Sequence, residues 1–89
     1  MDLLIPIMTI NDFKALNNVG QAKELGNGTF LAWRIHQDFH VVLYNLYGFY
    51  VEVYCSLKTD HFPIMKPFGS TDQLRPYLDK MEIKELQQA

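Results

Sequence analysis

One stretch of the sequence, from Gly28 to Phe68, contains nearly every segment that has the character of a β-strand. Aliphatic and aromatic residues alternate along it with polar residues, which is the pattern of half-buried strands. Short groups of turn-forming residues divide the stretch, one of them containing Gly48. We therefore predict an α+β fold, in which a four-stranded antiparallel meander over residues 28–68 is flanked by helices that pack on one face.

The segment before the sheet, residues 9–26, predicts helical structure. Thr9 or Asn11 can cap a helix, and apolar residues then recur at helical spacing. Asn18 and Gly20 interrupt the pattern, so two short helices and one kinked helix both remain possible. The residues before this segment, 1–8, form an apolar arm that we expect to pack onto the core or onto a partner.

The segment after the sheet, residues 70–86, also predicts helical structure. Ser70 can cap it, with Gln73 completing a capping box. Pro76 is disfavoured inside a helix but accepted in its first turn, so we expect a turn over 71–75 and a new helix from Pro76. All 89 residues together form a single domain.

Composition narrows the possible functions. A net charge of -2 with scattered basic residues gives no footprint for nucleic acid or for an anionic membrane. No apolar run approaches the roughly 20 residues of a membrane-spanning helix, and the amino-terminus lacks the basic region of a secretory signal. The single cysteine, Cys55, excludes an intramolecular disulfide and suits a reducing compartment. We expect a cytoplasmic protein without a cofactor or a bound metal.

Side-chain alternation assigns the two faces of the sheet once the turns are fixed. Turns of three residues at 37–39 and 46–48 place the main apolar residues of the first three strands on one side, with Gly48 at the left-handed position. Trp33 is then the largest core residue. The predicted core face consists of Leu31, Trp33, Ile35, Val41, Leu43, Phe49, Val51, Val53 and Cys55. Pro63 and Pro67 make the fourth strand, at 61–68, an edge strand.

The opposite face is the candidate binding surface. It consists of Arg34, His36, His40, Val42, Tyr44, Tyr50, Glu52 and Tyr54. In this register, three tyrosines surround Val42, and His36 lies directly opposite His40. Arg34 and Glu52 are a whole strand apart, about 10 Å, and form no ready acid–base pair.

Four interpretations of this face remain open. It can be a half-wetted surface without a role, or a protein contact, because tyrosine is common in interfaces. It can bind a small ligand or a metal, conceivably as an enzyme, through His36, His40, Tyr54 and Glu52. A base-stacking platform for single-stranded nucleic acid would need a basic groove that the sequence does not supply.

Three motifs resemble a group of small bacterial proteins of unknown function. They are GTFL at 28–31, LYNLYGFYVEVY at 43–54 and STDQLRPYL at 70–78. The resemblance spans roughly residues 28–83 and implies a small helix–sheet–helix domain. It implies no activity, because no catalytic residues are known for the group that could be transferred to this sequence.

From the residues themselves we predict a non-catalytic interaction module. We expect it to form a homodimer, or to bind a protein partner, through the tyrosine-bearing face or through an edge strand.

Overall fold

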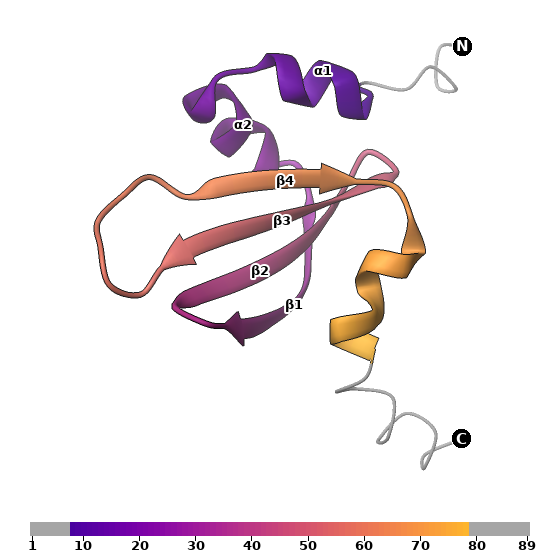
Figure 1. Ribbon diagram of the computed structural model, residues 1–89. Helices are drawn as coiled ribbons and strands as arrows, with labels where there is room; N and C mark the ends of the chain where they lie inside the picture. The colour runs from indigo at the N-terminus through magenta and orange to yellow at the C-terminus, as the bar shows by residue number, and fades with distance from the viewer. Residues whose placement is uncertain (1–7, 79–89) are drawn as a thin grey trace, which may run out of the picture.

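The structure, a computed structural model, describes residues 8–78 and contains one four-stranded antiparallel sheet with helical segments before and after it (Figure 1). The strands follow the order β1-β2-β3-β4, which confirms the predicted α+β meander. Most of the predicted arm, 1–7, and the end of the predicted last helix, 79–86, lie outside the described residues. The elements are α1 (Ile10–Ala15), α2 (Asn18–Leu25), β1 (Thr29–His36), β2 (Phe39–Leu46), β3 (Phe49–Ser56), β4 (Ile64–Phe68) and η2 (Thr71–Leu74).

Two short helices precede the sheet, which confirms the first of the two arrangements that the sequence left open, two short helices or one kinked helix. Thr9 begins α1 with a capping box: its Oγ1 accepts from the Asp12 N–H at 3.1 Å, and its own N–H donates to Asp12 Oδ2 at 3.0 Å. Asn17 separates the helices and caps α2, its Oδ1 accepting from the Gly20 N–H at 2.8 Å. Capping at both starts lets these brief helices form. Among the described residues, no helix has the length and apolar character needed to cross a membrane.

Both hairpins turn on two residues, and not on three as the sequence suggested. Gln37 and Asp38 connect β1 to β2, while Tyr47 and Gly48 connect β2 to β3. Two-residue turns need positive φ angles, and these occur at Gln37 (55°), Tyr47 (51°) and Gly48 (93°). Only Gly48 was expected to adopt one. The shorter turns shift β2 by one residue and reverse all of its side chains.

The revised register divides the predicted core between the two faces of the sheet. Trp33, Val42, Val53 and Met65 form one row across the four strands, and Ala32, Leu43, Glu52 and Lys66 form the next row, on the opposite face. Val41 and Leu43 therefore project from the other face of the sheet, and not from the face that carries Trp33. Near the start of β1 the pairing shifts between Phe30 and Ala32, where Leu31 forms an irregularity of the bulge type.

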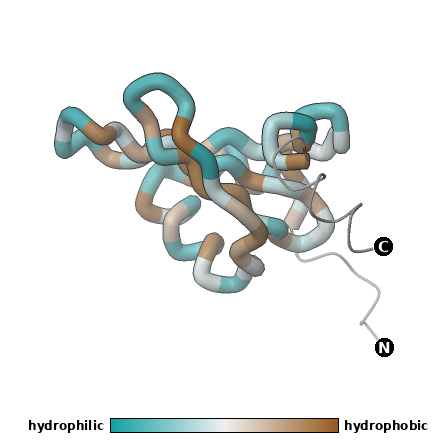
Figure 2. Tube along the Cα trace, turned by 90° about the horizontal axis from the view of Figure 1, so that it is seen from below, coloured by the Kyte–Doolittle hydropathy of each residue, from teal (hydrophilic) through white to brown (hydrophobic). Residues whose placement is uncertain are grey.

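Because buried side chains project from both faces, the two helical ends pack on opposite faces, and the expectation of a single covered face is wrong. α1 and α2 lie against the face of Trp33, where buried Phe13 is the central contact. Tyr77 packs on the other face with Leu43 and Phe68. In Figure 1 the amino-terminal helices lie beside β4, and the chain leaves β4 into η2 away from them. Figure 2 shows hydrophobic residues within the sheet and hydrophilic residues on many surrounding turns.

The fourth strand is an edge strand, as predicted, but it is shorter. Ile64–Phe68 pairs only with β3, while residues 57–63 form a loop. After it, Ser70 Oγ accepts from the Asp72 N–H at 3.1 Å and caps η2, so the cap is present without the expected box to Gln73. Residues 75–78 continue as a helix, one residue before the predicted start at Pro76.

The positive φ of Gln37 provides a first testable prediction. A residue with a Cβ is strained in this region by about 1–2 kcal/mol, and glycine is not. We expect Gln37→Gly to raise the free energy of unfolding by about 0.5–1 kcal/mol, measured by urea denaturation.

Tyr47 supplies the matched comparison, since it also has a positive φ but makes contacts that glycine would lose. Its hydroxyl donates to Glu24 Oε1 at 2.8 Å and accepts from Asn27 Nδ2 at 3.1 Å, tying the end of α2 to the second turn. Tyr47→Gly should give no gain in stability. If Gln37→Gly instead lowered the free energy of unfolding, the positive φ of Gln37 would carry no strain.

Candidate functional site

The structure divides the predicted binding face between the two sides of the sheet. Arg34, His36, Tyr50, Glu52 and Tyr54 lie on the face covered by Tyr77. His40, Val42 and Tyr44 lie on the face covered by α1 and α2. The reversal of β2 is the cause, since all three displaced residues belong to that strand. The eight residues therefore do not form one surface.

The two histidines of the alternative metal site are separated in the same way. His36 pairs with Phe39 and His40 pairs with Ile35, so their imidazoles are on opposite faces and cannot share an ion. The His40 ring lies edge-on to Trp33, with 5.2 Å between the ring centroids. Within residues 8–78, no group of three or more His, Cys, Asp or Glu side chains is placed to hold a metal.

A buried polar network occupies the face covered by Tyr77, and Glu52 is its centre. Although Glu52 is only 8% exposed, both carboxylate oxygens accept hydrogen bonds. Oε2 accepts from the Tyr77 hydroxyl at 2.7 Å and from Arg34 Nη2 at 3.2 Å. Oε1 accepts from the Tyr54 hydroxyl at 3.3 Å. A buried carboxylate needs such partners, because an unpaired one is costly.

The contact between Arg34 and Glu52 corrects the prediction that a strand would keep them apart. Strand spacing separates backbones, whereas a long arginine side chain can reach across the intervening strand. Arg34 also donates to the Tyr54 hydroxyl at 3.4 Å, and its guanidinium carbon lies 5.2 Å from the centroid of the Tyr77 ring. These contacts join β1, β3 and the carboxy-terminal helical residues.

The network raises the pKa values of Tyr77, Tyr54 and Arg34. Burial raises the pKa of the Tyr77 hydroxyl above the ordinary tyrosine value of 10.0, and the hydrogen bond to Glu52 raises it further. Burial and the Glu52 charge likewise raise the pKa of Tyr54. For Arg34, burial lowers the pKa, but interactions with Tyr77 and Glu52 outweigh it, and the pKa is raised above its ordinary value. At neutral pH both hydroxyls stay protonated and donate to Glu52, so the network acts as a structural clamp.

Over β1, the described helices do not cover the face that carries Trp33, and several large apolar side chains are exposed there. We name this surface the β1 patch. It consists of Phe30, Trp33, Ile35, His40, Val42 and Leu57, which together line a shallow groove of about 290 Å³. Four of its members are about half exposed: Trp33 56%, Leu57 57%, Phe30 54% and Ile35 51%. His40 is its one titratable side chain.

The exposure of Trp33 corrects its prediction as the largest core residue. The apolar residues that pack with Phe13 come from β2, β3, β4 and the helices, and none of them comes from β1. The reason is size. With 1.5 Å of rise per residue, α1 and α2 are only about 9 and 12 Å long, whereas the sheet spans about 14 Å across its strands and about 26 Å along them. Helices this short cover only part of the face, and they lie beside β4, at the opposite edge from β1.

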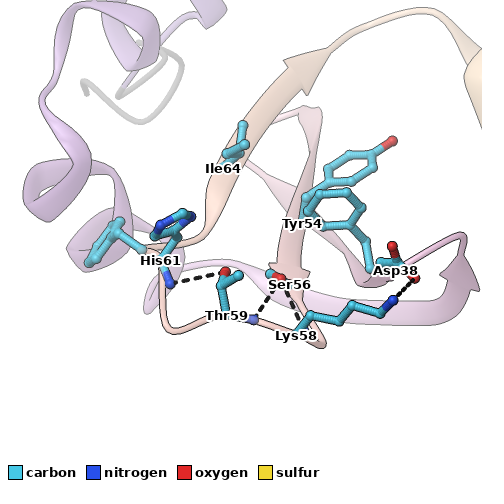
Figure 3. Close-up of a pocket in the computed structure, with 9 residues that line it drawn as sticks. Asp38, Tyr54, Ser56, Lys58, Thr59, His61 and Ile64 are labelled. Atoms are coloured by element: carbon cyan, nitrogen blue, oxygen red, sulfur yellow. Dashed lines mark hydrogen bonds and ion pairs between the residues drawn. The ribbon is translucent and has the colours of Figure 1, made fainter.

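A second hollow lies on the other face, between the β1–β2 turn and the loop before β4 (Figure 3). Tyr54 and Ile64 form part of its wall, with Phe39 beside the Tyr54 ring at 5.8 Å between centroids. Ser56 Oγ accepts from the Lys58 and Thr59 N–H groups at 3.1 Å, and Lys58 forms an exposed ion pair with Asp38 at 3.7 Å. These bonds order the loop, while exposed polar side chains still line the hollow, which has a volume of about 330 Å³.

Comparison with known proteins names no relative. No protein-family model matches the chain, and no curated protein or solved structure matches it. The resemblance to small bacterial proteins stays a prediction.

The geometry alone therefore has to support a function. The buried network is internally hydrogen-bonded, and Arg34 Nε is its one buried polar atom without a partner among the described residues. The second hollow has two large apolar side chains that are about half exposed, Phe62 and Ile64, against four in the β1 patch. The β1 patch is different, because it exposes large apolar side chains that make few contacts within the described chain.

Proposed function

We propose that this protein is an interaction module that binds another protein surface through the β1 patch. The observation that carries the proposal is the half exposure of Phe30, Trp33, Ile35 and Leu57 around one groove. Contiguous apolar surface of this kind is uncommon on a monomer and is typical of interaction sites. The proposal keeps the predicted partner class but moves the binding surface away from the tyrosines.

The chemistry of the patch favours a protein partner. Interface centres are depleted of charge and enriched in tryptophan and phenylalanine, and the β1 patch contains both aromatics and no Asp, Glu, Lys or Arg. A phosphate backbone would need cations at the contact, and the patch offers none. Trp33, the largest exposed side chain, is the expected binding hot spot.

Photo-crosslinking in the native host tests this proposal. Ile35 in the patch and Ile64 on β4 are matched controls, since they are 51% and 53% exposed and lie on opposite faces. A benzoyl-phenylalanine at position 35 should give protein adducts about tenfold more abundant than one at position 64. Adducts with any protein count, including a second copy of the chain. Equal or absent adducts from position 35 would refute the assignment of the β1 patch.

A further inference from the structure

The two edges of the sheet are protected unequally. β4 carries Pro67, which cannot donate a hydrogen bond, and Lys66; both residues discourage the addition of another strand. β1 contains neither proline nor lysine along Thr29–His36. Its bulge at Leu31 affects one end only. Of the two edges, β1 is the one that residues 8–78 leave open to pairing.

The backbone of β1 has hydrogen-bonding groups directed toward that edge. His36 and Phe39 close a two-residue turn and form a hydrogen-bonded pair, and such pairs alternate along an antiparallel ladder. Arg34, two residues back, therefore bonds to β2. The N–H and C=O groups of Trp33 and Ile35 consequently point away from β2, toward the free edge.

We propose that the occupant of the β1 patch is a second copy of this chain, bound by antiparallel pairing of the two β1 strands. This inference rests on the proposed function, because it names the partner of the same surface. The pairing joins two four-stranded sheets into one of eight strands and places both β1 patches side by side. Both edges then satisfy their outward backbone groups while the aromatic side chains of the patches meet.

The charges on β1 permit a contact between identical copies. Its only charged side chain, Arg34, lies on the opposite face from the patch and is held by Glu52 at 3.2 Å. In a two-fold symmetric dimer, the two β1 patches therefore do not bring like charges together. A different partner would gain specificity from complementary charges, and the patch provides none.

The same residue selects the register of pairing. A two-fold axis at Arg34 would place two arginine residues at directly opposed positions, and like charges at such positions are destabilising. An axis at Trp33 avoids this and pairs Trp33 with the partner's Trp33, Arg34 with the partner's Ala32, and Ile35 with the partner's Leu31. It also joins the outward groups of Trp33 across the axis, so we assign this register.

Sedimentation equilibrium tests the assembly, again with the matched isoleucines. Across about 10 µM to 1 mM, the parent chain should reach twice the chain mass. Ile35→Lys should raise the dimer dissociation constant about tenfold or more, because lysine on an edge strand blocks pairing. Ile64→Lys should leave it unchanged. A parent chain that stays monomeric throughout, or a dimer unaffected by Ile35→Lys, would overturn the inference.

Hydrogen exchange separates edge pairing from other modes of dimerisation. Raising the parent concentration should slow exchange of the Trp33 and Ile35 amides about tenfold or more, while the Arg34 amide, already bonded to β2, should change little. A dimer without this selective protection would refute strand pairing. A monomeric chain whose position 35 still crosslinks a different protein would refute self-pairing and leave the proposed function standing.

Discussion

Glu52→Ala should lower the free energy of unfolding by about 3–5 kcal/mol, the usual cost of breaking a buried ion pair. The substitution removes the acceptor of three hydrogen bonds and leaves the Arg34 charge buried, its side chain being 13% exposed. The free energy of unfolding of a small domain is only about 5–15 kcal/mol, so this loss would be a large part of it. Urea denaturation followed by circular dichroism measures the change.

An exposed ion pair in the same chain is the control. Lys58 Nζ lies 3.7 Å from Asp38 Oδ1, with the two side chains 72% and 61% exposed. Asp38→Ala should cost less than about 1 kcal/mol, because solvent screens such pairs. The double variant Arg34→Met with Glu52→Leu should recover most of the loss by removing both charges. A Glu52→Ala effect as small as that of Asp38→Ala would show that the network is not a clamp.

Phe13→Ala should produce a comparable loss of about 3–5 kcal/mol, by the cavity that a deleted core phenylalanine leaves. Phe13 is fully buried and stacks edge-on against Phe49, with 6.0 Å between ring centroids. Its carbonyl also accepts from Gln21 Nε2 at 3.0 Å, which joins α1 to α2. Because α1 has six residues, it depends on this packing. Thermal melting and amide exchange in α1 and α2 measure the effect.

Phe62 is the matched control, a phenylalanine that is 47% exposed in the loop before β4. Phe62→Ala should change the free energy of unfolding by less than about 1 kcal/mol. The two variants remove the same atoms, so the difference isolates burial. Equal effects would contradict the placement of Phe13 at the centre of the packing between helices and sheet.

The order of elements was predictable because local chemistry determines it. Thr9 is a strong cap, alternation defines the strands, and Pro67 confines β4 to an edge. Each signal depends on a few neighbouring residues, and the structure agrees with each.

The faces of the sheet were not predictable, because they depend on a single residue of turn length. Gln37 and Tyr47 adopt positive φ angles that their residue types disfavour, and no local pattern announces this. Tyr47 is held there by Glu24 and Asn27, more than 19 positions away in sequence. One wrong turn length then reverses β2 and scatters the predicted site.

The β1 patch could have been anticipated by comparing sizes. Helices of six and eight residues are short beside strands of eight, so part of the sheet face was expected to remain uncovered. Residue spacing does not indicate which of the two edge strands the helices leave uncovered. That depends on α1 and α2 lying beside β4.

The position of α1 and α2 at the β4 edge also affects which strand unfolds first. β3 pairs with a strand on both sides, whereas β1 and β4 each pair with one strand. Since α1 and α2 contact β4, at the opposite edge from β1, we expect fraying to start at β1 and to reach β3 last. If a second copy pairs with β1, this edge strand becomes an interior strand of the joined sheet. Dimerisation would then make β1 more rigid than it is in the monomer.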